Sequence, residues 1–255
     1  MMVIIILLSV IALGSFSYFS IKQSLLTTAK NDLKDLIKFN KTKISNWYQT
    51  KTKEIAKITS NSLISHYDSY YKSQASNILG NYKNIDYIFL VDKDGKLLTD
   101  NYTRNKTGET TAKVDFQFKN YDFFQNLINS SNQDRIYNGV IKSPIKSNNH
   151  LYIFAKPIFD ASKSEKTIKG IAIMGFTLSN FNTIIKDLKS TEKYTFFITN
   201  KNQIIYHDNM NMINNNFQNN NNTKNNSNEV NFNLNGKKFY GVKTPLSYKN
   251  HDLYI

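Results

Sequence analysis

The chain has 255 residues, is 40% hydrophobic and contains no cysteine, so it can bury a core in one or two domains but has no disulfide, thiolate metal site or cysteine nucleophile. Its net charge of +14 comes almost entirely from lysines spread along an asparagine-rich sequence, with Arg104 and Arg135 as the arginines. Because base and phosphate recognition favours arginine, we interpret the charge as a compositional bias and expect no nucleic-acid partner.

The first 21 residues carry no charged side chain and have the length that a helix needs to cross a bilayer. A cleaved signal peptide is the alternative, with residues 12–14 as the small-residue cleavage site. We favour a retained membrane anchor, because no basic segment precedes the apolar run and the helical pattern continues beyond it. Lys22, Lys30 and Lys34 follow the run, and the positive-inside rule would then place the rest of the chain in the cytoplasm, in conflict with an extracytoplasmic domain.

A helical pattern covers residues 21–76, and we assign residues 22–80 to one long helix. Its apolar residues recur three or four apart, at Leu26, Ala29, Leu33, Leu36, Ile37, Ile44, Trp47, Ile55, Ile58 and Leu63. Such a narrow stripe is typical of a helix that packs on its own domain. It also fits a coiled-coil-like homodimer of the membrane-proximal half, and both interpretations can hold for different halves of the helix.

A hairpin is predicted over residues 85–100, where an apolar strand runs into the turn that contains Gly95. Glycine can adopt the positive φ that such a turn needs. A similar pattern returns over residues 194–208. Two similar hairpins, each followed by a β-rich segment, predict two related modules in tandem, over residues 81–190 and 191–255.

The remaining predicted elements complete an α+β fold with antiparallel sheets. In the first module they are a helix over residues 121–128, strands over 135–142, 151–159 and 168–178, and a connecting helix over 178–188. In the second module they are a loop in the asparagine-rich run 211–228 and strands over 229–234, 237–243 and 252–255. Because the sequence stops within a predicted strand, we expect the second module to be truncated.

No arrangement of residues indicates catalysis. The histidines at 66, 150, 207 and 251 have no metal-binding spacing, and nucleotide-binding or nucleophile motifs are missing. Asp92, Asp94 and Asp100 bracket the first hairpin turn; we interpret them as turn formers, with a weak calcium site as the alternative. We expect no enzyme activity, no catalytic residue, no metal and no cofactor.

Aromatic side chains are dense in the first module, at Phe116, Tyr121, Phe123, Phe124, Tyr137 and Phe154. They can pack in the core, or some of them can line a small-molecule pocket, since such pockets combine aromatic walls with a few polar groups. Tyr121 and Lys142 are the nearby polar candidates.

Five segments in this order resemble the double-Cache (dCache) extracytoplasmic sensor domains of chemoreceptors, sensor histidine kinases and diguanylate cyclases. They are VDKDGKLL (91–98), NYDFFQNLI (120–128), IFAKPIFD (153–160), GIAIMGFTLSNF (170–181) and FFITNKNQIIYHD (196–208). The resemblance implies a long N-terminal helix followed by two tandem PAS-like (Cache) modules.

Departures from the family pattern bear on the ligand. Family members that bind amino acids carry an Arg and a Trp-Tyr pair in the helical segment, and a Tyr and an Asp downstream. Here Tyr121 stands in place of the Arg, Phe123 and Phe124 in place of the pair, Val140 in place of the Tyr and Gly175 in place of the Asp. Without the charged groups a zwitterion would lose much of its binding energy, so we predict that α-amino acids are not bound in the usual way.

The resemblance therefore implies the ligand-sensing domain of a bacterial transmembrane receptor, most simply a methyl-accepting chemotaxis protein. A small molecule would bind the membrane-distal first module, and the long helix would transmit the signal. The expected ligand-binding residues are Phe116, Tyr121, Phe123, Phe124, Lys142 and Gly175. The alternative is a membrane-anchored surface module that binds anionic cell-wall polymer or lipid and has no signalling output.

Overall fold

The computed structural model describes residues 2–61, 64, 79–82, 84–100, 117–130, 132, 134–144, 150–160, 167–177, 197–200, 203–207, 212, 229–234, 237–246 and 251–254. Within these ranges the side chains of residues 2, 3, 5, 8, 99, 100, 197, 200, 203, 205, 206, 229–234, 237–240 and 251–254 are also outside the description. Three predictions lie outside the described residues: the site residue Phe116, the helix over 178–188 and, apart from Met212, the loop over 211–228.

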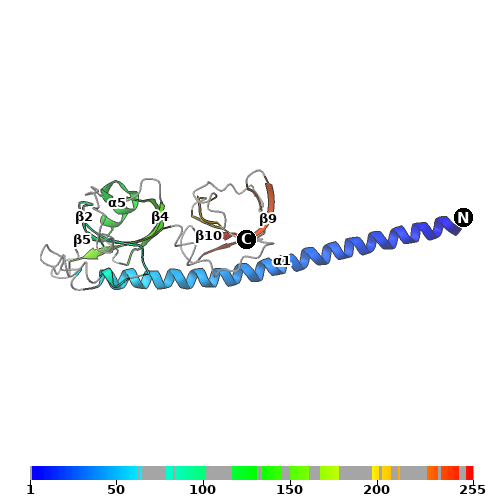
Figure 1. Ribbon diagram of the computed structural model, residues 1–255, viewed down its shortest axis with the longest axis horizontal. Coiled ribbons are helices and arrows are strands. Elements are labelled where there is room, and N and C mark those ends of the chain that lie inside the picture. Colours follow the sequence, from blue (N-terminus) through cyan, green and yellow to red (C-terminus); the bar gives the residue numbers. More distant parts are fainter. Residues whose placement is uncertain are drawn as a thin grey trace, which may run out of the picture.

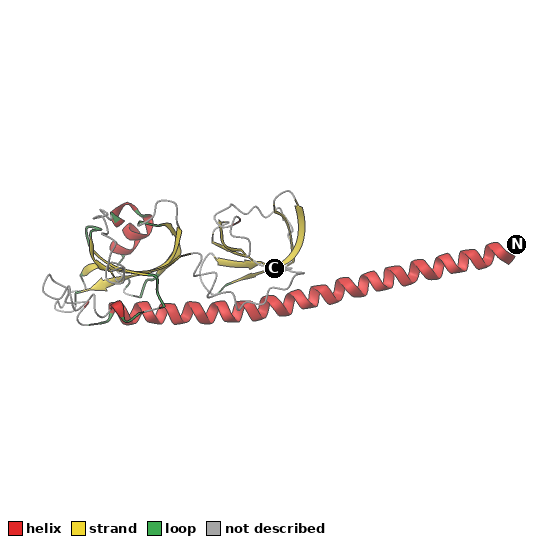
Figure 2. Cartoon of the chain, in the orientation of Figure 1, coloured by secondary structure: helices red, strands yellow, loops and turns green. Residues whose placement is uncertain are grey.

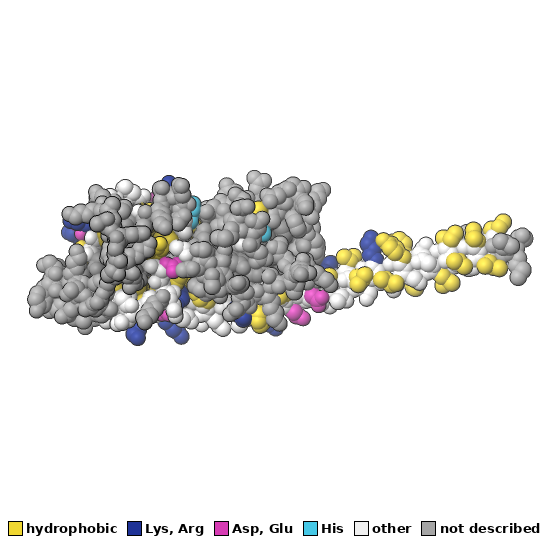
Figure 3. Space-filling view, viewed as in Figure 1, with side chains coloured by type: hydrophobic (Ala, Val, Ile, Leu, Met, Phe, Trp, Pro, Cys, Tyr) yellow, Lys and Arg dark blue, Asp and Glu magenta, His cyan; other side chains and the backbone are white. Residues whose placement is uncertain are grey.

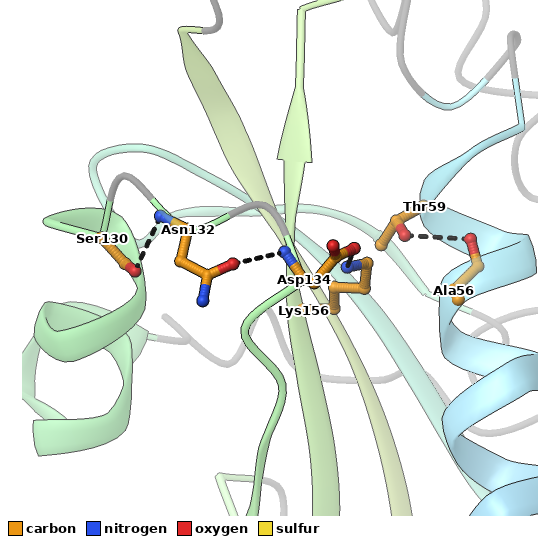
Figure 4. Close-up of polar contacts among 6 residues, drawn as sticks. All are labelled: Ala56, Thr59, Ser130, Asn132, Asp134 and Lys156. Carbon is orange, nitrogen blue, oxygen red and sulfur yellow. Dashed lines mark hydrogen bonds and ion pairs between the residues drawn. The ribbon is translucent and has the colours of Figure 1, made fainter.

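The first element is the long helix α1 (Met2–Thr59), which runs past Ile21 without a break. It ends before residue 76, because Ser60 and Asn61 are not helical. At this end the hydroxyl of Thr59 donates a hydrogen bond to the carbonyl oxygen of Ala56 at 3.1 Å (Figure 4). The same carbonyl oxygen also accepts a hydrogen bond from the backbone N–H of Ser60 at 3.0 Å.

In the part of the chain that the structure describes, no helix is both long enough and apolar enough to cross a membrane.

Two five-stranded antiparallel sheets follow α1. The first contains β1 (Tyr87–Asp92), β2 (Leu97–Asp100), β3 (Tyr137–Lys142), β4 (His150–Phe159) and β5 (Ile168–Thr177), in the order β2-β1-β5-β4-β3. The second contains β6 (Phe197–Asn200), β7 (Gln203–His207), β8 (Glu229–Leu234), β9 (Lys237–Pro245) and β10 (His251–Tyr254), in the order β7-β6-β10-β9-β8. The two sheets therefore have the same strand order, because each strand of the second sheet takes the place of the corresponding strand of the first. The predicted α+β fold with two tandem modules is confirmed.

The hairpin of β1 and β2 forms around Gly95, whose φ of +85° is the positive value that the sequence predicts. One carboxylate oxygen of Asp92 accepts hydrogen bonds from the backbone N–H groups of Asp94 (2.9 Å) and Lys96 (2.8 Å). Asp92 therefore acts as a turn former. The carbonyl of Gly95 also accepts a hydrogen bond from the N–H of Phe118, which ties the turn to the segment that leads to α5.

The first module has three layers, with its sheet between α1 and the short helix α5 (Asp122–Ile128), as Figure 2 shows. Successive side chains of a strand point to opposite faces, and β5 follows this rule. Ala172, Met174 and Phe176 belong to the core on the α1 side. Ile171 and Ile173 belong to the core on the α5 side. We call these two sides the α1 face and the α5 face.

Both modules pack on α1. Figure 1 shows the first module beside the C-terminal part of the helix and the second module beside its middle, while the N-terminal part projects beyond both. A stripe of buried α1 residues joins the core on the α1 face: Leu33, Ile37, Ile44, Tyr48, Ile55 and Ile58. Ile198, Val242 and Leu246 of the second module belong to the same core. The ammonium of Lys41 also donates a hydrogen bond to the hydroxyl of Thr244 at 3.5 Å. The helix is a shared support for the two sheets.

Candidate ligand-binding site

The floor of the candidate site is one row of residues that crosses the first sheet on its α5 face. Strand register places Tyr87 of β1 beside Gly175 of β5, Gly175 beside Ile153 of β4, and Ile153 beside Gly139 of β3. Because Gly175 and Gly139 have no side chain, no atoms beyond the backbone cover the sheet at these two positions. We call these four residues the glycine row.

The space above Gly175 is closely bordered. A Cβ atom at this position would lie 3.3 Å from Cδ1 of Leu151 and 3.5 Å from Cβ of Tyr87. These distances are a tight fit against a flexible leucine and an ordinary contact with the tyrosine. A larger side chain at residue 175 would therefore fill the space over the floor.

Six aromatic rings form a continuous chain of ring contacts that begins at Tyr87 of this row. The centroid distances are 5.9 Å for Tyr87–Phe89, 5.4 Å for Phe89–Phe118, 5.9 Å for Phe118–Tyr121, 5.7 Å for Tyr121–Phe123 and 5.1 Å for Phe123–Tyr137. These separations are typical of favourable ring pairs. The three phenylalanines are buried, whereas the three tyrosines are half-buried. The chain of rings thus presents phenol groups at the border between core and solvent.

Tyr121 joins the beginning of α5 to the end of β3. It is the residue before the first turn of α5, and its hydroxyl donates a hydrogen bond to the carbonyl oxygen of Lys142 at 3.0 Å. The side chain of Lys142 is exposed and alternates with Ile141, which packs on the α5 face. The structure therefore brings the backbone of Lys142, and not its ammonium group, to Tyr121.

The other expected site residues lie together. Phe123 stacks on Tyr137, Phe124 is buried in the core on the α5 face, and Gly175 is in the glycine row. Phe116 lies outside the described residues. The expected set did not contain four residues of this region, Tyr87, Tyr137, Gly139 and Ile153. The alternation of residues along each predicted strand would have indicated them, once the pairing of the strands was known.

The described side chains that are buried on the α5 face carry no charge. The two buried lysines, Lys51 and Lys156, lie on the opposite side of the sheet: Lys51 is on α1, and Lys156 is in β4, where it alternates with Ala155 of the α5 face. Figure 4 shows Lys156 directed toward the exposed carboxylate of Asp134, 3.7 Å away.

Burial also affects the tyrosines of the site. Burial raises the pKa of Tyr121. Burial, and to a smaller extent the negative charge of Asp122, raises the pKa of Tyr137. Both phenols therefore stay protonated and uncharged at neutral pH, and both can donate a hydrogen bond.

A cavity of about 20 Å³ lies elsewhere in the first module, lined by Ile64, Leu90, Val91, Leu98, Ile158, Lys169 and Gly170. Ile64, Leu90 and Ile158 of its lining belong to the core on the α1 face, and Leu98 packs against that core. It has room for about one water molecule and none for an organic ligand. Within the described ranges no group of histidine and acidic side chains is placed to hold a metal ion.

Comparison with known proteins identifies the family. Residues 21–255 match the family model of the Cache domain of the dCache_1 type, so the chain belongs to this family. Cache domains of this type are ligand-binding sensor domains and not enzymes. At the level of the family, this confirms the predicted ligand-sensing role and the prediction that the chain is not an enzyme. Among curated proteins, none matches this sequence.

Several solved structures with a similar fold are chemoreceptor domains. The sensory domain of Campylobacter jejuni Tlp3 with isoleucine bound is 14% identical, with 92% of this chain and 94% of that chain covered and a TM-score of 0.60. The ligand-binding domain of Pseudomonas fluorescens CtaA in complex with L-serine is 13% identical, with 88% and 95% covered and a TM-score of 0.66. That of Pseudomonas aeruginosa PctB in complex with L-Arg is 13% identical, with 88% and 92% covered and a TM-score of 0.65. At these identities the likeness shows the fold.

Proposed function

We propose that this chain is the extracytoplasmic sensor region of a bacterial transmembrane receptor of the chemotaxis type. The observation that carries the proposal is the match of residues 21–255 to the Cache family, together with a fold shared with the chemoreceptor domains Tlp3, CtaA and PctB. The structures of these three proteins contain bound amino acids, namely isoleucine, L-serine and L-Arg. In this chain the small molecule binds on the α5 face of the first module, over the glycine row and beside Tyr121 and Phe123.

The N-terminal part of α1 is proposed to be embedded in the membrane. Large apolar side chains are exposed all along it, at Ile4, Ile6, Leu7, Val10, Ile11, Leu13, Phe16, Tyr18, Phe19 and Ile21. Figure 3 shows apolar side chains on the projecting part of the helix, clear of both modules. Phe16, for example, is 74% exposed. A helix that is apolar on all sides needs an apolar surrounding, and a bilayer supplies it.

Signal transmission is proposed to use α1, which contacts strands of both sheets. A ligand that binds one arrangement of helix and sheet more tightly than another shifts the population toward the first. Phe39, which is 40% exposed, and the exposed Leu25 and Leu26 support a homodimer in which two copies of α1 pack together.

One experiment tests the location of the domain. The chain has no cysteine, so a single Lys119→Cys substitution at an exposed position provides a unique label site. In intact cells, a membrane-impermeant maleimide is expected to label this variant and to leave the parent chain unlabelled. Labelling that needs cell lysis would place the module in the cytoplasm and contradict the proposal.

A second experiment tests the sensing role. The chain is fused to the signalling half of a well-characterised chemoreceptor, and receptor methylation is measured with a panel of metabolites. We expect at least one small molecule of the panel to change the methylation level. Tight, strongly salt-dependent binding of an anionic cell-wall polymer, with no response to small molecules, would favour the surface-module alternative.

A further inference from the structure

Among the described residues, none that is buried on the α5 face carries a charge that could pair with an ionic ligand. Across the residues that the structure describes, the cores on the two faces differ in this respect, since Lys51 and Lys156 are buried toward α1 while the core residues toward α5 are apolar or aromatic. Lys142 is exposed, and its side chain leaves toward the α1 face. An ion that enters a water-poor site without a charged partner loses its hydration and gains little in return.

The shape of the α5 face suits a flat molecule. From Tyr87 on β1 to Gly139 on β3 the glycine row crosses three strand spacings, which is roughly 14 Å. Tyr87 stands at one end of the row, and the stacked pair of Phe123 and Tyr137 comes from α5 and β3 at the other end. Aromatic rings pair best with other rings in offset or edge-on contacts.

Polar groups are also present at the border of this region, and they are uncharged. Tyr121 and Tyr137 keep their protons at neutral pH, and each hydroxyl oxygen can accept one hydrogen bond while its O–H donates another. The O–H of Tyr121 is directed to the carbonyl of Lys142, so its oxygen is left as an acceptor. Such groups suit a ligand hydroxyl or amide and offer nothing specific to a carboxylate.

We infer that the ligand of this site is an uncharged ring compound with a hydroxyl or amide substituent, and not an ion or a zwitterion. The inference rests on the proposed sensing function and names the chemical class that the same site accepts.

Four probes that share one ring and differ in charge test the inference. Benzyl alcohol is neutral, benzylamine is a cation, benzoate is an anion and L-phenylalanine is a zwitterion at neutral pH. Each is titrated into the full chain in detergent by isothermal titration calorimetry. We expect benzyl alcohol to bind about tenfold or more tightly than each charged probe, since an unpaired buried charge is strongly disfavoured.

Two matched variants locate the binding on the α5 face. Phe123→Leu keeps an apolar side chain but removes a ring of the six-ring chain, and we expect it to weaken benzyl alcohol binding about three- to tenfold. Phe176→Leu is the control, because the same change is made at a fully buried position on the opposite, α1 face of the same sheet. Gly175→Val is expected to abolish binding, since its side chain fills the space beside Leu151 and Tyr87. The melting temperature of each variant shows that it is folded, and Gly175→Ala replaces Gly175→Val if the latter is not.

The inference is overturned if any charged probe binds as tightly as benzyl alcohol, or if none of the four binds up to its solubility limit. Equal weakening by Phe123→Leu and Phe176→Leu would also overturn it. These outcomes leave the sensing function standing, because maleimide labelling and receptor methylation test that function separately.

Discussion

Tyr48 of α1 and Tyr152 of β4 form a hydrogen bond between their hydroxyl groups, at a fully buried contact between the helix and the first sheet. Their rings also meet edge to face, with centroids 5.8 Å apart. The pair connects two residues that are 104 positions apart in the sequence. The pair therefore holds α1 directly to the module that carries the candidate site.

The first prediction concerns this pair. Tyr48→Phe and Tyr152→Phe should each lower the free energy of unfolding by about 1–2 kcal/mol, because each leaves a buried hydroxyl without its partner. The double variant should cost less than the sum of the two, since it removes both hydroxyls together. Urea unfolding of the four proteins checks this. Strict additivity would show that the hydrogen bond contributes no coupling.

The second prediction concerns Asn40, which lies in the buried stripe of α1. It is fully buried, and neither atom of its amide has a hydrogen-bond partner among the residues that the structure describes. Asn40→Leu should raise the free energy of unfolding by about 1–3 kcal/mol, because it removes an unsatisfied buried polar group. Asn46→Leu, at an exposed position of the same helix, is the control and should change stability by about 0.5 kcal/mol or less. A loss of stability in Asn40→Leu would contradict the prediction.

The third prediction is a pH dependence. In the unfolded chain the tyrosine pKa is 10.0, whereas in the folded protein burial first, and Asp122 second, raise the pKa of Tyr137. Above about pH 10 the unfolded chain releases this proton while the folded protein retains it, so the free energy of unfolding falls as pH rises. Below that pH the contribution is fully present. Tyr137→Phe should make the decline shallower, as measured by urea unfolding at about pH 8 and about pH 11. An unchanged slope would show that Tyr137 titrates normally.

The fourth prediction restores charge to the site. Tyr121→Arg should raise the affinity for L-phenylalanine about tenfold or more and weaken the binding of benzyl alcohol, because a charged hydrogen bond would then hold the carboxylate. Calorimetry measures both ligands. Gln125→Arg, which adds charge at an exposed position of α5, should change neither affinity.

Local patterns in the sequence predicted the elements of the fold well. The run 151–159 and the strand β4 (His150–Phe159) differ by one residue, and the run 229–234 coincides with β8 (Glu229–Leu234). In these segments apolar residues either alternate with polar ones or form a continuous run. Only a strand buries the apolar side chains of such short patterns. The positive φ of Gly95 was predictable for a similar reason, because the hairpin requires it.

The candidate site depended on contacts that no local pattern contains. Tyr87 and Gly139 share a row only because β5 and β4 lie between β1 and β3 in the sheet. Ile141 and Lys142 are successive residues of β3, so their side chains point to opposite faces of the sheet. Ile141 packs on the α5 face and Lys142 points away from it. Tyr121 and Lys142 appeared near each other in the prediction as two polar side chains, whereas the contact that forms joins a hydroxyl to a backbone carbonyl. Pairing of distant strands had to be known before the residues could be assigned to a face.

The sharing of α1 by both modules has a consequence for the synthesis of the protein. The helix leaves the ribosome before either sheet, and the residues that cover its apolar stripe are made much later; Lys41 and Thr244, which form a hydrogen bond, are 203 positions apart. Contacts of such long range form slowly, since the intervening chain must be ordered before they can stabilise it. The stripe of α1 therefore stays uncovered through most of translation, and the nascent chain needs protection from aggregation until β9 and β10 have been added.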